Sequence, residues 1–185
     1  MSTVDALIER IRDRDDEAAL TLLNAEPQLA REHSSRDGQL HGASPLHWAA
    51  HRNSVRVCER LLELGAEVND SASDWWLTPL SWAADAASVE VVELLLARGA
   101  DVNQDAVVGT TALDAAAMGG SSRGARDPEA YRRTAEVLLA HGASVDGLPE
   151  RKRTPLDESM KSGNAAVEKV LRANGGRASE DPSGS

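Results

Sequence analysis

Apolar residues recur in short blocks along most of the chain, at the spacing of one helix face. In the run 89–96, for example, Val91, Val92, Leu95 and Leu96 lie three and four positions apart, which predicts an amphipathic helix. A shorter apolar block precedes this run and opens with a Thr-Pro pair. The pattern therefore predicts a pair of short helices joined by a turn.

The same helix pair is repeated along the chain. Its opening motif occurs four times, as SPLHWAA from Ser44, TPLSWAA from Thr78, TALDAAA from Thr111 and TPLDESM from Thr154. In three of these units a glycine follows 21 residues after the start of the motif, but it follows 31 residues after Thr111, so ten extra residues lie inside that unit. Copies of one short unit predict a stacked array of helix pairs in place of a single globular core.

Each unit also carries its own helix boundaries. Thr78 is a good N-cap, and Pro79 suits the first helical position, where its missing N–H group is not needed. Residues that are small or tolerate a left-handed backbone separate the two helices of each unit: Asn53, Ala87, Gly120 and Gly163. Gly99 ends a second helix and predicts the start of an extended loop. Each unit is thus a helix pair followed by a loop.

These motifs, in register four times over, resemble the ankyrin repeat family, whose unit carries a TPLH-x-A motif over a period of 33 residues. The resemblance covers residues 3–177 and implies an all-α fold, an ankyrin-repeat solenoid of about five stacked helix pairs with short hairpin-like finger loops. Two positions depart from the family motif. Ala112 replaces its proline, and only His47 keeps its histidine, which is replaced elsewhere by Ser81, Asp114 and Asp157.

We expect residues 1–177 to form a single ankyrin-repeat domain. Two amphipathic runs within residues 1–30 predict an N-terminal capping repeat, and residues 44–177 hold the four recognisable repeats. Residues 178–185 consist largely of Ser, Gly, Pro and acidic residues and predict a disordered tail.

The insertion lies at about residues 121–130, between the two helices of its repeat. It begins as a flexible loop and ends in a helix start, with Asp127 as the cap and Pro128 in the first turn. This start would lengthen the second helix of the repeat through Tyr131. The insertion is either functional or a neutral surface addition.

The composition limits the classes of function. The 185 residues carry a net charge of −10 and their densest basic stretch is 151–153, whereas nucleic-acid-binding proteins cluster basic residues against phosphates. We interpret these three charges as a solvated loop, with contact to a phosphate or an acidic partner as the alternative. No apolar run approaches the ~20 residues of a membrane helix, and the charged N-terminus does not resemble a secretory signal. We expect a cytoplasmic protein that binds neither nucleic acid nor membranes.

Signals for catalysis are weak. The five histidines have no metal-ligand spacing with cysteines or carboxylate pairs, and the chain has no Gly-rich phosphate loop or nucleophile motif. The single cysteine, Cys58, aligns with Val92 of the next repeat and is interpreted as a small core residue. The sequence therefore predicts no catalytic residue, no cofactor and no metal.

The resemblance instead implies protein binding on the concave face that the fingers and the first helices form. Our leading hypothesis is a non-enzymatic protein–protein interaction module that holds a partner segment through an apolar, Trp-rich patch. Trp76 stands at a turn where other repeats have glycine, and tryptophan is enriched in binding hot spots. The patch comprises Asp74, Trp75, Trp76, Leu77, Val107, Val108, Met118, His51, Asp85, Trp82 and Trp48.

Trp48 and Trp82 occupy equivalent positions of successive repeats. They should stack one above the other, and we interpret them first as structural packing. The equivalent residue of the next repeat is Ala115, whose small side chain leaves room for an apolar hollow.

Two alternatives share this patch. An enzyme or small-molecule-binding protein would use an apolar pocket lined by tryptophans and Met118, with His51, Asp85 and Asp74 as polar groups. Self-association would instead cover the patch with a second copy, although we expect a monomer.

Overall fold

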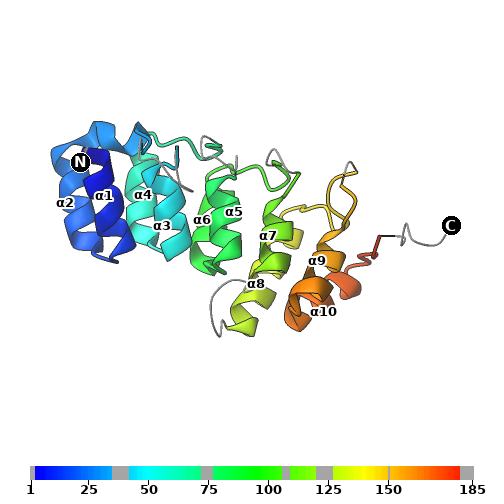
Figure 1. Cartoon of the computed structure of the whole chain (residues 1–185). Coiled ribbons are helices and arrows are strands. Elements are labelled where there is room, and N and C mark those ends of the chain that lie inside the picture. Colours follow the sequence, from blue (N-terminus) through cyan, green and yellow to red (C-terminus); the bar gives the residue numbers. More distant parts are fainter. Residues whose placement is uncertain are drawn as a thin grey trace.

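A computed structural model describes residues 3–34, 42–71, 77–105, 109–119, 127–149 and 151–179. Within these segments the chain forms ten α-helices, one 3₁₀ helix and no strands, which confirms the predicted all-α fold. None of these helices is both long enough and apolar enough to span a bilayer. In chain order they are α1 (Thr3–Arg12), α2 (Asp16–Ala25), the 3₁₀ helix η1 (Pro27–Arg31), α3 (Pro45–Arg52), α4 (Val55–Glu63), α5 (Pro79–Asp85), α6 (Val89–Ala97), α7 (Ala112–Met118), α8 (Pro128–Ala140), α9 (Pro155–Ser162) and α10 (Ala165–Ala173) (Figure 1).

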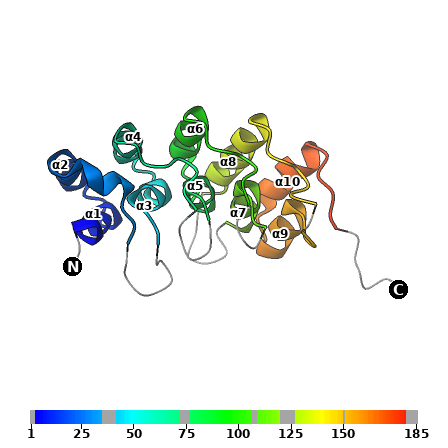
Figure 2. The same cartoon turned by 90° about the horizontal axis from the view of Figure 1, so that it is seen from above.

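The helices stand in two rows (Figure 2). The first helices of the pairs, α1, α3, α5, α7 and α9, form one row, and the second helices, α2, α4, α6, α8 and α10, form the other. Each helix packs on its pair partner and on the equivalent helix of the adjacent pair. We call the side formed by the first helices and the connecting loops the first-helix face. The arrangement is the predicted solenoid of helix pairs.

The helix starts follow the predicted capping chemistry. The Thr78 hydroxyl oxygen accepts a hydrogen bond from the backbone N–H of Ser81 at 3.1 Å, and Pro79 is the first residue of α5. α7 begins without a proline, yet Thr111 and Asp114 cap each other. The Asp114 carboxylate accepts from the Thr111 N–H at 2.9 Å, and the Thr111 oxygen accepts from the Asp114 N–H at 3.3 Å. This reciprocal box offsets the loss of the motif proline at Ala112.

The turns within and after the pairs also follow the sequence. Asn53 and Ala87, with φ of 57° and 52°, and Gly163, with φ of 72°, lie at the predicted breaks between helices, and all three adopt a left-handed backbone. Gly99 ends α6 with a φ of 88°. Gly120 lies outside the described residues.

The core lies between the rows and between successive pairs. One leucine of each opening motif is buried there, and the buried alanines of the first three motifs are small enough to let the first helices approach closely. Cys58 is also fully buried, as predicted, and this burial raises the pKa of its thiol. The buried leucines of the four opening motifs are Leu46, Leu80, Leu113 and Leu156.

The insertion lengthens α8, as predicted. The Asp127 carboxylate accepts from the Glu129 N–H at 2.9 Å, Pro128 opens the helix, and α8 has 13 residues where α4 and α6 have 9. Tyr131 lies in the added turn. It is buried against Gly119, and its hydroxyl donates to the backbone carbonyl oxygen of Asp85 at 2.7 Å. The extra turn therefore joins the fourth helix pair to the end of α5. Residues 120–126 lie outside the described residues.

Gly119→Ala should destabilise the fold through this tyrosine. A Cβ atom at position 119 would lie 2.1 Å from Cε1 of Tyr131, a distance that requires atoms to move. We expect a loss of about 1–3 kcal/mol in the free energy of unfolding, measured by urea denaturation. In a Tyr131→Leu background the same substitution should cost clearly less. Equal losses in the two backgrounds would contradict the assigned contact.

Candidate binding face

Trp48 and Trp82 lie side by side on α3 and α5. Their ring centroids are 5.3 Å apart, and the ring planes are inclined by 84°. The predicted contact is present, but it is edge-to-face and not a parallel stack. This geometry is the one that the ring quadrupoles favour. Trp48 is 8% exposed, whereas Trp82 is half-buried, so Trp82 presents more of its indole to the surface.

Other side chains extend this contact along the first-helix face. The guanidinium of Arg12, on α1, lies 4.8 Å from the centroid of the Trp48 ring, in a cation–π arrangement. The ring of His51 lies 6.1 Å from that of Trp82. We call Arg12, Trp48, His51 and Trp82 the aromatic row. It crosses three successive first helices.

His47 holds the loop that leads to α5. Its ring is fully buried and lies 5.3 Å from that of Trp82. Because the Leu77 carbonyl can only accept, Nε2–H donates to it, at 2.8 Å, and Nδ1 accepts from the Ser44 N–H at 3.3 Å. Burial disfavours the charged ring and lowers the pKa of His47 below 6.5. The neutral imidazole thus holds the backbone of Leu77 beside the aromatic row.

The other predicted site residues fall into two groups. Met118 ends α7 and is half-buried, next to Ala115 and Gly119, and Asp85 ends α5, where its carbonyl accepts from Tyr131. The structure therefore brings the rings of Trp48 and His51 against that of Trp82. Leu77 lies just before α5, and Asp85 and Met118 are the last residues of α5 and α7. The remaining predicted residues, Asp74, Trp75, Trp76, Val107 and Val108, lie outside the described residues.

The interpretation of residues 151–153 as a solvated basic loop is wrong for Arg151. Its guanidinium lies 2.5 Å from the carboxylate of Asp114, which is fully buried, and 3.7 Å from Glu158. Asp114 replaces the motif histidine, and a buried carboxylate requires a cation. Asp114 and Arg151 are 37 positions apart and belong to different repeats, so no local sequence pattern predicted this pair. Arg153, by contrast, is largely exposed.

The motif position makes a bond to the following loop in three repeats. His47 donates to Leu77, Asp114 pairs with Arg151, and Asp157 accepts from the backbone N–H of Ser179 at 3.0 Å. The chemistry differs, but each bond attaches the start of a first helix to the segment that comes next. Ser179 belongs to the stretch 178–185 that the sequence assigned to a tail, of which residues 180–185 lie outside the described residues.

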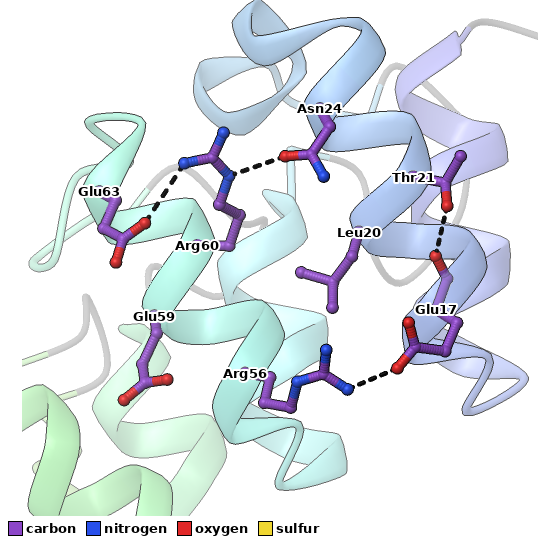
Figure 3. Close-up of a pocket in the computed structure, with 8 residues that line it drawn as sticks. All are labelled: Glu17, Leu20, Thr21, Asn24, Arg56, Glu59, Arg60 and Glu63. Atoms are coloured by element: carbon purple, nitrogen blue, oxygen red, sulfur yellow. Dashed lines mark hydrogen bonds and ion pairs between the residues drawn. The ribbon is translucent and has the colours of Figure 1, made fainter.

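A cleft that the sequence did not predict lies between α2 and α4, on the second-helix row (Figure 3). Its volume is about 370 Å³, and Leu20 projects between its two arginines. Arg56 pairs with Glu17, and Arg60 donates to Asn24 at 3.1 Å. Its cations are therefore already paired with groups of the chain, and it lies on the other side of the molecule from the aromatic row. In the described residues, no group of three histidine, cysteine or acidic side chains is placed to hold a metal ion.

The fold is a solenoid of stacked helix pairs. The family model for ankyrin repeats, in three copies, matches residues 6–106, and the chain belongs to the ankyrin repeat family. A search of curated proteins found no match. Ankyrin repeats are generally protein–protein interaction modules, and the family is typically non-enzymatic.

Arg151→Ala should be strongly destabilising because it leaves the Asp114 carboxylate buried without a cation. We expect a loss of about 3–5 kcal/mol in the free energy of unfolding, measured by urea denaturation. Arg153→Ala is the matched control from the same loop and should change stability by less than about 1 kcal/mol. Adding Asp114→Asn to Arg151→Ala should restore part of the loss. Similar effects of the two arginine substitutions would refute the buried pair.

Stability should fall in mild acid because of His47. The unfolded chain protonates this residue below its ordinary pKa of 6.5, whereas the folded chain does so only at lower pH. The free energy of unfolding should therefore decrease as the pH drops below 6.5, by at most about 1.4 kcal/mol per pH unit for one proton. His47→Gln should be less stable than the parent at neutral pH but lose less on acidification. Parallel pH profiles from denaturant titrations would exclude this role.

Proposed function

We propose that this protein is a non-enzymatic binding module that holds a polypeptide segment of a partner on its first-helix face. The observation that carries the proposal is the aromatic row, which ends at Trp82 on α5. The next first helix, α7, carries the small Ala115 at the position equivalent to Trp82, and it ends at the half-buried Met118. A half-buried indole with small neighbours offers a seat for an apolar or aromatic side chain. The anchors of the seat are Trp82 and Met118.

The loops complete this surface. Leu77 is held next to the aromatic row by His47, and the tryptophans and valines of the neighbouring finger loops belong to the same repeats as Trp82 and Met118. We assign these four loop residues, Trp75, Trp76, Val107 and Val108, to the partner-binding surface. Asp74, His51 and Asp85 are assigned to the same surface.

We assign the binding surface to a single domain, residues 1–177, that acts as a monomer. Every helix pair packs on the next one, from α1 and α2 through α9 and α10, which supports one continuous unit. Met160 is the one large hydrophobic residue that is clearly exposed among the described residues, at 48%, and it lies on α9, outside the aromatic row.

Selection from a random twelve-residue peptide library on the intact protein supplies a ligand with which to test this assignment. The affinity of the tightest selected peptide is then measured by calorimetry with the parent and with single variants. Met118→Ala should weaken binding about tenfold, and Trp82→Ala by at least as much, since truncation of a central anchor typically costs more than ~1 kcal/mol.

Met160→Ala is the matched control, because it is the same truncation at a residue that is not among those assigned to the surface and whose sulfur lies 3.6 Å from the guanidinium of Arg172 on α10. It should leave the affinity unchanged. Melting curves of each variant separate loss of the surface from loss of the fold. Peptides that bind Met118→Ala and Trp82→Ala as tightly as the parent would place the binding site elsewhere.

A further inference from the structure

Two arginines lie next to Trp48 on the first-helix face. Arg12, the last residue of α1, has its guanidinium 4.8 Å from the centroid of the Trp48 ring. Arg52, the last residue of α3, stands four positions after Trp48, so these two side chains lie on the same side of their helix. Since α1 packs against α3, one indole has a guanidinium of its own helix and one of the preceding first helix as neighbours.

The two guanidinium groups differ in how their charge is compensated. Arg12 donates a hydrogen bond to the carboxylate of Glu9 at 3.1 Å. The side chain of Arg52 forms no hydrogen bond or ion pair with any residue of the described segments. Arg52 is half-buried, and its Nε atom is fully buried without an acceptor. A cation that is partly removed from water without a counter-ion lowers stability.

The chain offers an acidic residue near Arg52 and does not use it. Asp13 directly precedes the left-handed Arg14, just as Arg52 directly precedes the left-handed Asn53, so Asp13 and Arg52 hold equivalent positions in adjacent helix pairs. Asp13 is nevertheless exposed and forms no ion pair with Arg52. The negative end of the α3 dipole favours a cation at Arg52. It leaves the N–H groups of the guanidinium without an acceptor.

We propose that the partner segment carries an aspartate or a glutamate whose carboxylate pairs with Arg52, beside Trp48 and the Arg12–Glu9 pair. A carboxylate can accept two parallel hydrogen bonds from a guanidinium, which is the strongest form of this pair. This inference rests on the proposed function, since it specifies one contact of the segment held on the first-helix face.

The charge of the whole protein limits how acidic that segment is. At a net charge of −10, the protein repels a strongly acidic chain at long range. The segment therefore carries its acidic residue among apolar and uncharged ones. For the same reason a general charge effect would enrich basic peptides, so an acidic residue among selected peptides is the mark of a local contact.

The peptides selected from the random library test the inference. They are synthesised with an amidated C-terminus, so that side chains supply their only carboxylates. The selected sequences should share one aspartate or glutamate near their apolar residues. Its replacement by asparagine or glutamine should weaken binding about tenfold, which corresponds to ~1.4 kcal/mol.

Two arginine variants of the protein separate a local pair from a general charge effect. Arg52→Gln and Arg98→Gln each remove one positive charge, but Arg98 is exposed at the end of α6, in the second-helix row. Arg52→Gln should weaken the peptide about tenfold, whereas Arg98→Gln should weaken it less than about twofold. Arg52→Lys, which keeps the charge but not the paired donors, should fall between the parent and Arg52→Gln.

Combining the two changes tests whether the groups touch. A peptide that has lost its acidic residue should bind Arg52→Gln as tightly as it binds the parent, because the pair is already broken. Melting curves of the variants show whether the fold is intact.

The possible failures are distinguishable. Peptides that require Met118 and Trp82 but share no acidic residue would overturn this inference and leave the proposed function standing. The same holds if the losses from Arg52→Gln and from the peptide change simply add, or if Arg52→Gln and Arg98→Gln have equal effects. Peptides that ignore Met118 and Trp82, or a selection that enriches no peptide, would count against both proposals.

Discussion

The structure depends on the packing of each helix pair against the next one. The first helices have 7 to 10 residues, and helices of this length are marginal in water on their own. They gain stability because one leucine of each motif is buried between adjacent pairs and the neighbouring alanines permit close approach. No pair has a core of its own, so the array is stable only as a row.

At the motif histidine position, three of the four repeats keep a bond to the following segment although the residue itself changes. His47, Asp114 and Asp157 are a neutral ring, a paired carboxylate and a hydrogen-bonded carboxylate, yet each is bonded to the segment that follows its helix pair. Buried polar groups must be satisfied in the low-dielectric interior. The family histidine supplies its own donor and acceptor, whereas the aspartate at position 114 requires a cation from the next loop. Because it pairs with Asp114, the side chain of Arg151 is mostly buried and does not lie on the surface.

The same row geometry generates the binding face. Equivalent positions on successive first helices lie side by side, so Trp48 and Trp82 meet although 34 positions separate them in the chain. The row is uneven along its length. It begins with Arg12 over Trp48, continues to the half-buried Trp82 and gives way to small side chains at Ala115 and Gly119.

The sequence by itself determined the helix pairs, their caps and their turns, because these features depend on residues three or four positions apart. Thr78, Gly99 and the helix start at Asp127 were all identifiable in this way. It also indicated that Trp48 and Trp82 meet, because the repeat period aligned them. Only the tertiary structure decided that Arg12 covers Trp48, that Tyr131 reaches Asp85 and that Arg151 faces inward. These contacts join residues 36 to 46 positions apart at places where the repeats differ, and their partners depend on which side chains happen to face each other across the stacked pairs.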